Sequence, residues 1–255
     1  MMVRIKLISA FLSAIFIWPA LAAGAPPSTK TETVQFPSGK ETIGGFLVAP
    51  DKPGQYPAII VVQEWWGVNS WIKEQTEKLA GEGYVALAVD LYGGKVATDP
   101  TKAHELSQGL PQDRAIADLQ AAYDYLSHRK DVRPDRIGAI GWGMGGGLSL
   151  QLAIHQQHLA ACVVNYGFLP TDPNDIQQIV TPVLGNFGAD DRGITPSDVS
   201  AFEKKMKEIN RRVDFKEYQG AGHAFANPDN ISGYRQDTAA EAWARTLVFL
   251  HKALS

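Results

Sequence analysis

Two side chains late in the sequence have the types and the spacing that acid–base chemistry requires. Asp191 ends the run Gly188-Ala189-Asp190-Asp191, and His223 follows a glycine in Gly220-Ala221-Gly222-His223. A histidine that is oriented by a carboxylate is a common base for activating a hydroxyl or thiol nucleophile. Asp191 is the expected carboxylate, and the adjacent Asp190 is the alternative for that role.

A glycine-rich turn lies upstream, in Gly141-Trp142-Gly143-Met144-Gly145-Gly146-Gly147. It follows a predicted strand and opens a predicted helix, and a turn this sharp leaves no room for side chains at Gly141 and Gly145. Turns of this kind present the nucleophile of hydrolases in which an acid and then a histidine follow along the chain. Gly143, Asp191 and His223 have that order, but Gly143 has no side chain that could attack a substrate.

The segments around these residues alternate between buried strands and helices. Apolar runs predict strands over 58–62, 85–89, 137–140, 159–164, 183–187 and 213–218, and helical spacing predicts helices over 71–80, 113–126, 144–154, 198–209 and 238–254. Ser197 is expected to cap the helix that begins at 198.

This alternation predicts an α/β fold with a mostly parallel central sheet and helices on both of its faces. The turn cluster Pro37-Ser38-Gly39-Lys40 joins residues 32–36 and 42–48 into an N-terminal antiparallel hairpin. Ligands of such sheets bind beyond the carboxyl ends of the strands, which is where the candidate residues lie.

From Glu32 to the C-terminus the sequence resembles the dienelactone hydrolase family of the α/β-hydrolase superfamily. The residues that carry the resemblance are Gln63-Glu64-x-x-Gly67-Val68-Asn69, Asp90-Leu91-Tyr92, Gly141-Trp142-x-Met144-Gly145-Gly146, Asp191 and Gly222-His223-x-Phe225. The resemblance implies an α/β-hydrolase fold, no cofactor, and cleavage of esters or lactones through an acyl-enzyme on a Cys-His-Asp or Ser-His-Asp triad.

The resemblance also implies a role for each site residue. The family's nucleophile position falls on Gly143. His223 would be the base and Asp191 would orient it and stabilise its charged form. The backbone N–H groups of Trp65 and Met144 would form the oxyanion hole, and they need no side chain to do so.

The expected substrate pocket departs from the family pattern. Two arginines that bind the carboxylate of dienelactone in the family correspond here to Gly94 and Asn227, and neither carries charge. Glu64 matches a family glutamate beside the nucleophile. An uncharged pocket is therefore expected, with aromatic side chains in its wall; the candidates are Trp65, Trp66, Tyr92, Tyr166 and Phe168.

Two other interpretations of the same residues are weaker. The glycine-rich turn also fits G-x-G-x-x-G, which leaves a dinucleotide-binding oxidoreductase as a remote alternative. The acid expected about 20 residues further on is missing, because residues 161–166 contain none. His155 and His158 have no partner cluster, so no metal site is expected.

The first 22 residues have the pattern of a secretory signal peptide. Arg4 and Lys6 precede an almost wholly apolar run over 7–20, and Ala20-Leu21-Ala22 resembles a cleavage site. An uncleaved membrane anchor is the alternative. We expect a tether over 23–30 and one α/β-hydrolase domain over 31–255, exported to the periplasm or secreted, with no stable membrane association after cleavage.

Composition limits the possible partners. The 255 residues have a formal net charge of −3 and contain no basic stripe, so nucleic acid is not an expected partner. Cys162 is the single cysteine of the sequence, so no intramolecular disulfide forms, and its apolar neighbours indicate a buried core position.

Two classes of function remain open. One is an ester or lactone hydrolase whose activity is weak or altered because Gly143 replaces the nucleophile. The other is a catalytically silent protein that binds a small molecule on the same scaffold, since a fold does not by itself determine a function. In both cases we expect a monomer.

Overall fold

Strands and helices alternate along most of the chain, as the apolar pattern predicts. The computed structural model describes residues 27–255, so the predicted signal peptide and the first part of the predicted tether lie outside the described residues. The elements are β1 (Thr29–Ser38), β2 (Glu41–Pro50), β3 (Tyr56–Val62), α1 (Ser70–Gly81), β4 (Val85–Asp90), α2 (Pro100–Gln108), α3 (Gln112–Ser127), β5 (Val132–Trp142), α4 (Met144–His155), β6 (Ala161–Asn165), α5 (Pro173–Gln178), β7 (Val183–Gly188), α6 (Pro196–Glu208), β8 (Val213–Tyr218) and α7 (Gln236–Leu254).

The eight strands form one sheet in the order β1-β2-β4-β3-β5-β6-β7-β8. β1 pairs antiparallel with β2, and β2 pairs antiparallel with β4, whereas the pairs from β4 through β8 are parallel. The predicted mostly parallel sheet with an N-terminal hairpin is therefore confirmed. β1 begins at Thr29, two residues before the predicted start of the domain, because Thr29 and Lys30 pair with the end of β2.

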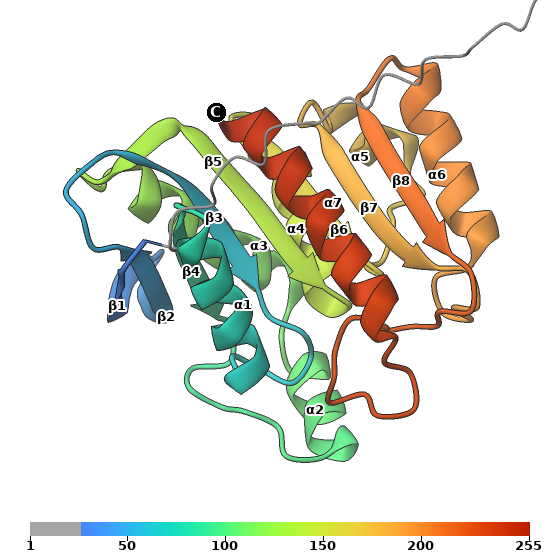
Figure 1. Ribbon diagram of the computed structural model, residues 1–255, viewed down its shortest axis with the longest axis horizontal. Coiled ribbons are helices and arrows are strands. Elements are labelled where there is room, and N and C mark those ends of the chain that lie inside the picture. The colour runs from blue at the N-terminus through green and yellow to red at the C-terminus, as the bar shows by residue number, and fades with distance from the viewer. Residues whose placement is uncertain (1–26) are drawn as a thin grey trace, which may run out of the picture.

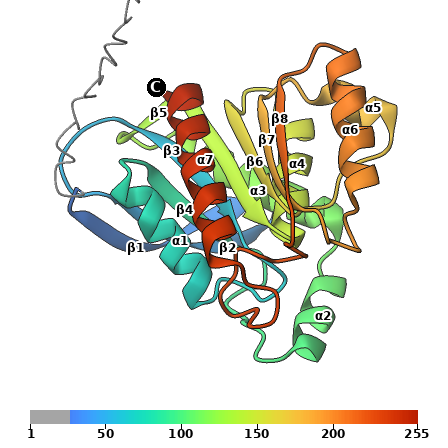
Figure 2. The ribbon, with the colours of Figure 1, turned by 45° about the vertical axis from the view of Figure 1, so that its right-hand side comes forward.

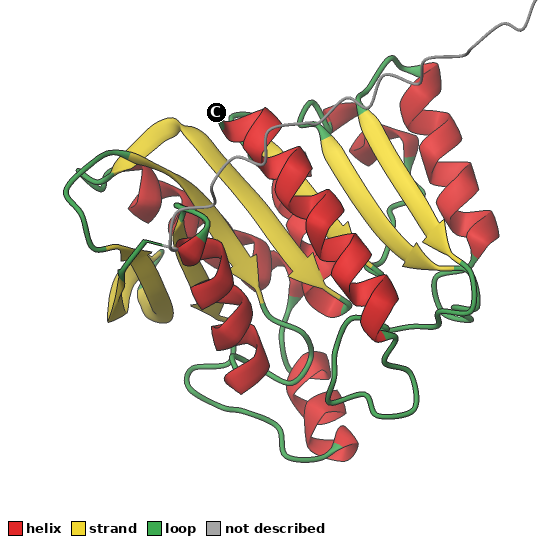
Figure 3. Ribbon diagram, viewed as in Figure 1, coloured by secondary structure: helices red, strands yellow, loops and turns green. Residues whose placement is uncertain are grey.

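Helices cover both faces of the sheet (Figure 3). α1 and α7 lie on one face, where Ile72 and Leu250 pack against Ile59 of β3 and its neighbours. α3, α4, α5 and α6 lie on the other, where Leu119 and Leu152 pack against Ile60. Successive residues of β3 thus point to opposite cores, which is why this strand is a continuous apolar run.

α2 is the exception to this layering. It projects beyond the edge of the sheet at which the arrowheads of β3 and β5 end (Figures 1 and 2). Asp99 caps α2 through a hydrogen bond from the Lys102 N–H, and within the helix Ala103 alone is buried. A helix with so little apolar surface has no periodic pattern, so the sequence did not predict it.

Two local expectations have different outcomes. Thr195, and not Ser197, caps α6, because Pro196 occupies the first helical position and Thr195 and Asp198 satisfy each other's backbone N–H groups. Cys162 is fully buried, as expected, and burial raises the pKa of its thiol.

Across residues 27–255, none of the helices has the length and apolar character required to cross a bilayer.

Candidate active site

The turn from β5 into α4 has the geometry of a nucleophile elbow. Gly143 has φ 52° and ψ −118°, a conformation that side-chain-bearing residues rarely adopt. Its N–H donates to the Asn165 carbonyl at 3.0 Å. A Cβ on Gly141 would overlap the backbone of Gly145, and a Cβ on Gly145 would overlap the Val62 carbonyl. Both flanking glycines are therefore required by the close approach of neighbouring backbone.

Gly143 itself has room for a side chain. A Cβ built on it would lie 3.6 Å from His223 Nε2 and 4.0 Å from Glu64 Oε1, with no closer neighbour. These are ordinary van der Waals distances. Gly143 thus fits its backbone conformation but does not fill the space in front of it.

Asp191 and His223 form the pair expected from their order in the sequence. The distance from His223 Nδ1 to Asp191 Oδ2 is 2.8 Å. Asp191 is buried, and its Oδ1 accepts hydrogen bonds from the Gly193 N–H at 2.8 Å and the Ile194 N–H at 3.1 Å. Asp190 is exposed, and His223 Nδ1 contacts Asp191 instead, so the alternative acid is not supported.

This contact determines which nitrogen of the ring is available. A carboxylate only accepts, so Nδ1 of His223 carries the hydrogen, and in the neutral ring Nε2 is left as an acceptor. Nε2 is the atom that faces the space above Gly143. Half of the His223 side chain is exposed, at 51%, so a substrate or a solvent molecule can reach it.

Glu64 is the second titratable group at this space. It is 4% exposed. Asn227 Nδ2 donates to its Oε2 at 2.7 Å, and the Tyr166 hydroxyl donates to its Oε1 at 3.4 Å. Burial raises the pKa of Glu64 from 4.5 to about 7, because two hydrogen bonds only partly offset the loss of hydration. Asp229 raises this pKa further by charge repulsion.

Two backbone N–H groups at the elbow are available to a ligand. Within residues 27–255, neither the Trp65 N–H nor the Met144 N–H donates to another backbone carbonyl. Met144 is the first residue of α4, so its N–H belongs to the unpaired positive end of the helix. Trp65 and Met144 both line the same cleft as Gly143 and His223. This arrangement is suited to stabilising an oxyanion.

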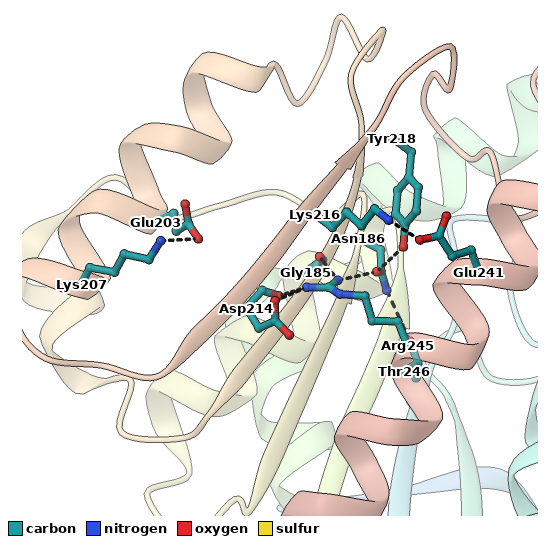
Figure 4. A network of polar contacts seen from close by, with 10 residues as sticks. All are labelled: Gly185, Asn186, Glu203, Lys207, Asp214, Lys216, Tyr218, Glu241, Arg245 and Thr246. Carbon is teal, nitrogen blue, oxygen red and sulfur yellow. Dashed lines mark hydrogen bonds and ion pairs between the residues drawn. The ribbon is translucent and has the colours of Figure 1, made fainter. Parts of the chain in front are cut away.

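A buried polar network lies behind the elbow. Asn165 Nδ2 donates to the Gly141 carbonyl at 3.1 Å, and Asn165 Oδ1 accepts from Asn186 Nδ2 at 2.9 Å. Asn186 in turn contacts Arg245 and Thr246 of α7, and Figure 4 shows these contacts between β7, β8 and α7. The network ties the elbow to α7 through side chains that do not line the cleft in front of Gly143.

The cleft in front of the elbow has a volume of about 1010 Å³. Three chain segments form its wall: the turn after β3, the end of α2, and the loop between His223 and α7. Its lining residues are Glu64, Trp65, Trp66, Ser107, Gln108, Gly143, Met144, His223, Ala224, Asn227, Asp229, Asn230, Ile231 and Ser232. Two of these are acidic and none is lysine or arginine.

The structure separates the predicted pocket residues into two groups. Glu64, Trp66 and Asn227 line the cleft. Tyr92 and Tyr166 do not: Tyr92 is buried with its hydroxyl 3.5 Å from Met144 Sδ, and Tyr166 is fully buried behind Glu64 and His223. They support the cleft from behind.

Two further expectations are corrected. Phe168 is 68% exposed and lies outside the cleft. Gly94 lines a separate hollow near β2. Conversely, the sequence did not point to α2 or to residues 229–232 as cleft residues, since neither segment has an apolar pattern or a motif.

Within the described residues, no His, Cys, Asp or Glu side chains cluster in a way that could hold a metal ion.

The parallel sheet, the elbow after β5, the acid after β7 and the histidine after β8 define an α/β-hydrolase fold. Comparison with known proteins then places the chain within that class. Residues 43–254 match the model of the Dienelactone hydrolase family. The chain belongs to this family, which confirms the resemblance seen in its motifs.

Individual relatives agree with this assignment. The chain is 31% identical over 218 residues to the "Probable 2-oxo-3-(5-oxofuran-2-ylidene)propanoate lactonase" of a Bradyrhizobium species, a match covering 80% of this chain and 87% of that protein. It is 31% identical over 227 residues to a "Putative carboxymethylenebutenolidase" of Yersinia pestis, covering 83% and 84%. A solved "Putative Dienelactone Hydrolase" from Klebsiella pneumoniae superposes with a TM-score of 0.81 at 27% identity, covering 88% and 99%.

Proposed function

We propose that this protein hydrolyses uncharged carboxylic esters or lactones slowly, with a water molecule as the nucleophile and no acyl-enzyme. The observation that carries the proposal is the position of His223 Nε2, which faces the space above Gly143 while Nδ1 contacts Asp191. A base in this position can take a proton from water as well as from a side chain.

The reaction needs one proton transfer to the ring and one from it. His223 accepts a proton from the attacking water, and Asp191 stabilises the imidazolium that results. The Trp65 and Met144 N–H groups stabilise the oxyanion. His223 then donates the proton to the leaving oxygen. In triad enzymes that lose catalytic side chains, the oxyanion hole and substrate binding still give roughly 10³–10⁴-fold acceleration over water.

The charge of the cleft favours uncharged substrates. Its ionisable lining residues are Glu64, Asp229 and His223, and no lysine or arginine offsets the two acids. An anionic lactone would be repelled, because like charges at short range raise its binding free energy. Trp65, Trp66 and other apolar groups at the mouth favour an ester with an apolar acyl or alcohol group.

Restoring a nucleophile tests this proposal. Gly143→Cys or Gly143→Ser should raise hydrolysis of a short p-nitrophenyl ester by orders of magnitude and produce burst kinetics. Adding His223→Ala to either variant should remove the gain. Steady-state and stopped-flow release of p-nitrophenolate, with circular dichroism of each variant as the folding control, measure both effects.

The second candidate is a catalytically silent binding protein. It is favoured by Gly143 itself, since glycine takes the elbow conformation without the strain of about 1–3 kcal/mol that another residue bears. Loss of a nucleophile in exchange for stability is a known compromise. A Gly143→Cys variant that folds well and stays as inert as the parent would favour this second function.

We also propose that the protein is exported as a monomer after cleavage near Ala22. The order of basic, apolar and small residues over 1–22 supports export. Intact-mass analysis and size-exclusion chromatography of protein from the native host test both points. A full-length mass in the membrane fraction would contradict the export proposal. An elution volume that corresponds to twice the monomer mass would contradict the proposal of a monomer.

A further inference from the structure

The space above Gly143 has a hydrogen-bond acceptor on two sides. His223 Nε2 lies 3.6 Å and Glu64 Oε1 lies 4.0 Å from the position of a Gly143 Cβ. Nε2 accepts because Nδ1 donates to Asp191. Glu64 Oε1 also accepts: it receives a hydrogen bond from the Tyr166 hydroxyl at 3.4 Å and has a second lone pair, while Oε2 accepts from Asn227.

The two distances show what an atom at the position of a Gly143 Cβ can reach. An N–H···O or O–H···O hydrogen bond spans about 2.5–3.2 Å between heavy atoms. A single atom at the Cβ position therefore reaches neither His223 Nε2 nor Glu64 Oε1. A molecule with two heavy atoms and a donor at each end can approach both, and a cysteine or serine side chain at this position would likewise add two heavy atoms.

We propose that this space binds a small protic nucleophile with two heavy atoms and a donor at each end, of the class of hydroxylamine and hydrogen peroxide, and that the protein transfers an acyl group to it. This inference rests on the proposed ester chemistry of the same site and names the nucleophile. One end donates to Glu64 Oε1 and the other end, which attacks, donates to His223 Nε2.

The transfer balances without any redox change. With hydroxylamine, the nitrogen attacks the ester carbonyl carbon, and His223 Nε2 takes a proton from that nitrogen. The Trp65 and Met144 N–H groups hold the oxyanion. The bond to the alcohol oxygen then breaks, and His223 returns the proton to that oxygen. The products are a hydroxamic acid and an alcohol; hydrogen peroxide gives a peroxy acid and an alcohol in the same way.

Hydroxylamine is the probe for the experiment, with phenyl acetate as the ester. Acetohydroxamate is measured as its coloured iron(III) complex, and acetate formation in the absence of hydroxylamine is measured separately. We expect hydroxamate formation to saturate with hydroxylamine concentration. Its rate should exceed that of the His223→Ala variant on the order of a hundredfold, as general-base catalysis provides.

Three comparisons test the site itself. Methoxyamine has a similar amino group, but it lacks the hydroxyl donor and has a third heavy atom, so its reaction should not saturate. Gly143→Ala fills the space with a Cβ, and Glu64→Gln replaces an acceptor by an amide of the same shape. Both variants should lose saturation by hydroxylamine, and thermal unfolding of each shows whether it is folded.

The outcomes for the two proposals are distinguishable. One result would overturn this inference and leave the proposed function standing. In it, the protein hydrolyses phenyl acetate in buffer, but the rate of hydroxamate formation rises linearly with hydroxylamine concentration and does so equally in Gly143→Ala. Saturable hydroxamate formation with or without hydrolysis supports the inference. Neither reaction above the rate of the His223→Ala variant would reject both.

Discussion

The elbow and the space in front of it are adjacent regions with opposite tolerance for added atoms. At Gly141 and Gly145 a single Cβ would overlap neighbouring backbone, whereas at Gly143, between them, a Cβ meets nothing closer than 3.6 Å. The elbow is a packed frame, and the space holds the titratable groups Glu64 and His223. The frame therefore specifies the geometry of the site, while the occupant of position 143 determines its chemistry.

The largest expected effect is on the frame. Gly145→Ala should destabilise the protein by about 3 kcal/mol or more, because the new methyl group meets the carbonyl groups of Val62 and Gln63 at the end of β3 and cannot move aside. Gly81→Ala is the matched control, since a Cβ there meets no atom within 4 Å. Urea unfolding measures both, and similar midpoints for the two variants would show that the elbow is not tightly packed.

Among the groups that face the space above Gly143, Glu64 should have the largest effect on stability, and this effect depends on pH. Its pKa is raised in the folded protein from 4.5 to about 7, so the folded state holds the proton more tightly than the unfolded state does. Stability from this group is therefore complete below pH 4.5 and falls as the pH rises through 7, by about 3 kcal/mol at most.

Glu64→Gln isolates this effect, because the amide does not titrate. The stability of the wild type relative to Glu64→Gln should fall between pH 5 and pH 8, as measured by urea unfolding at each pH. A difference that does not change with pH would mean that Glu64 is ionised at an ordinary pKa.

The polar network behind the frame should have a smaller but measurable effect. Asn186→Ala should cost about 2 kcal/mol, because it leaves two buried groups, Asn165 Oδ1 and the Tyr218 hydroxyl, without their partner. Lys207→Ala removes the exposed contact to Glu203, also drawn in Figure 4, and should change stability by less than about 0.5 kcal/mol. Equal effects in thermal unfolding would show that the network does not hold the elbow.

Among the residues of the site itself, the smallest expected change in stability is at the centre. Gly143→Ala should destabilise by about 1–2 kcal/mol, through backbone strain at φ 52° alone, since the methyl group has room. Differential scanning calorimetry measures the shift against wild type. A loss as large as that of Gly145→Ala would remove the distinction between frame and space.

Sequence patterns predicted the sheet and most helices because those elements are buried. β3 and β4 are continuous apolar runs, and the glycines of the elbow occur where backbone segments meet. The same logic failed for α2 and α5, which begin at Pro100 and Pro173 and bury one residue each. Their starts carry a recognisable signal, an aspartate cap followed by proline at the first helical position.

The order of the three site residues along the chain could be predicted from the sequence, but most of the residues that surround the site could not. The distances between Gly143, Asp191 and His223 follow from three strand ends at one edge of the sheet. The buried asparagines at 165 and 186 are polar side chains within apolar strands, and no spacing rule relates residues on neighbouring strands. Tyr166 and Phe168 differ by two positions, yet one is fully buried and the other is exposed, because the chain turns at Tyr166 with φ 40°.

The room for a side chain at Gly143 also has a genetic consequence. A glycine codon that ends in a pyrimidine becomes a cysteine codon or a serine codon by a single base change. The Asp191–His223 contact and the two elbow N–H groups do not depend on the residue at 143, so such a change meets a site that is already assembled. A codon of that kind would place a nucleophilic enzyme one mutation away from this protein, and selection for growth on an ester would find it among single-base variants.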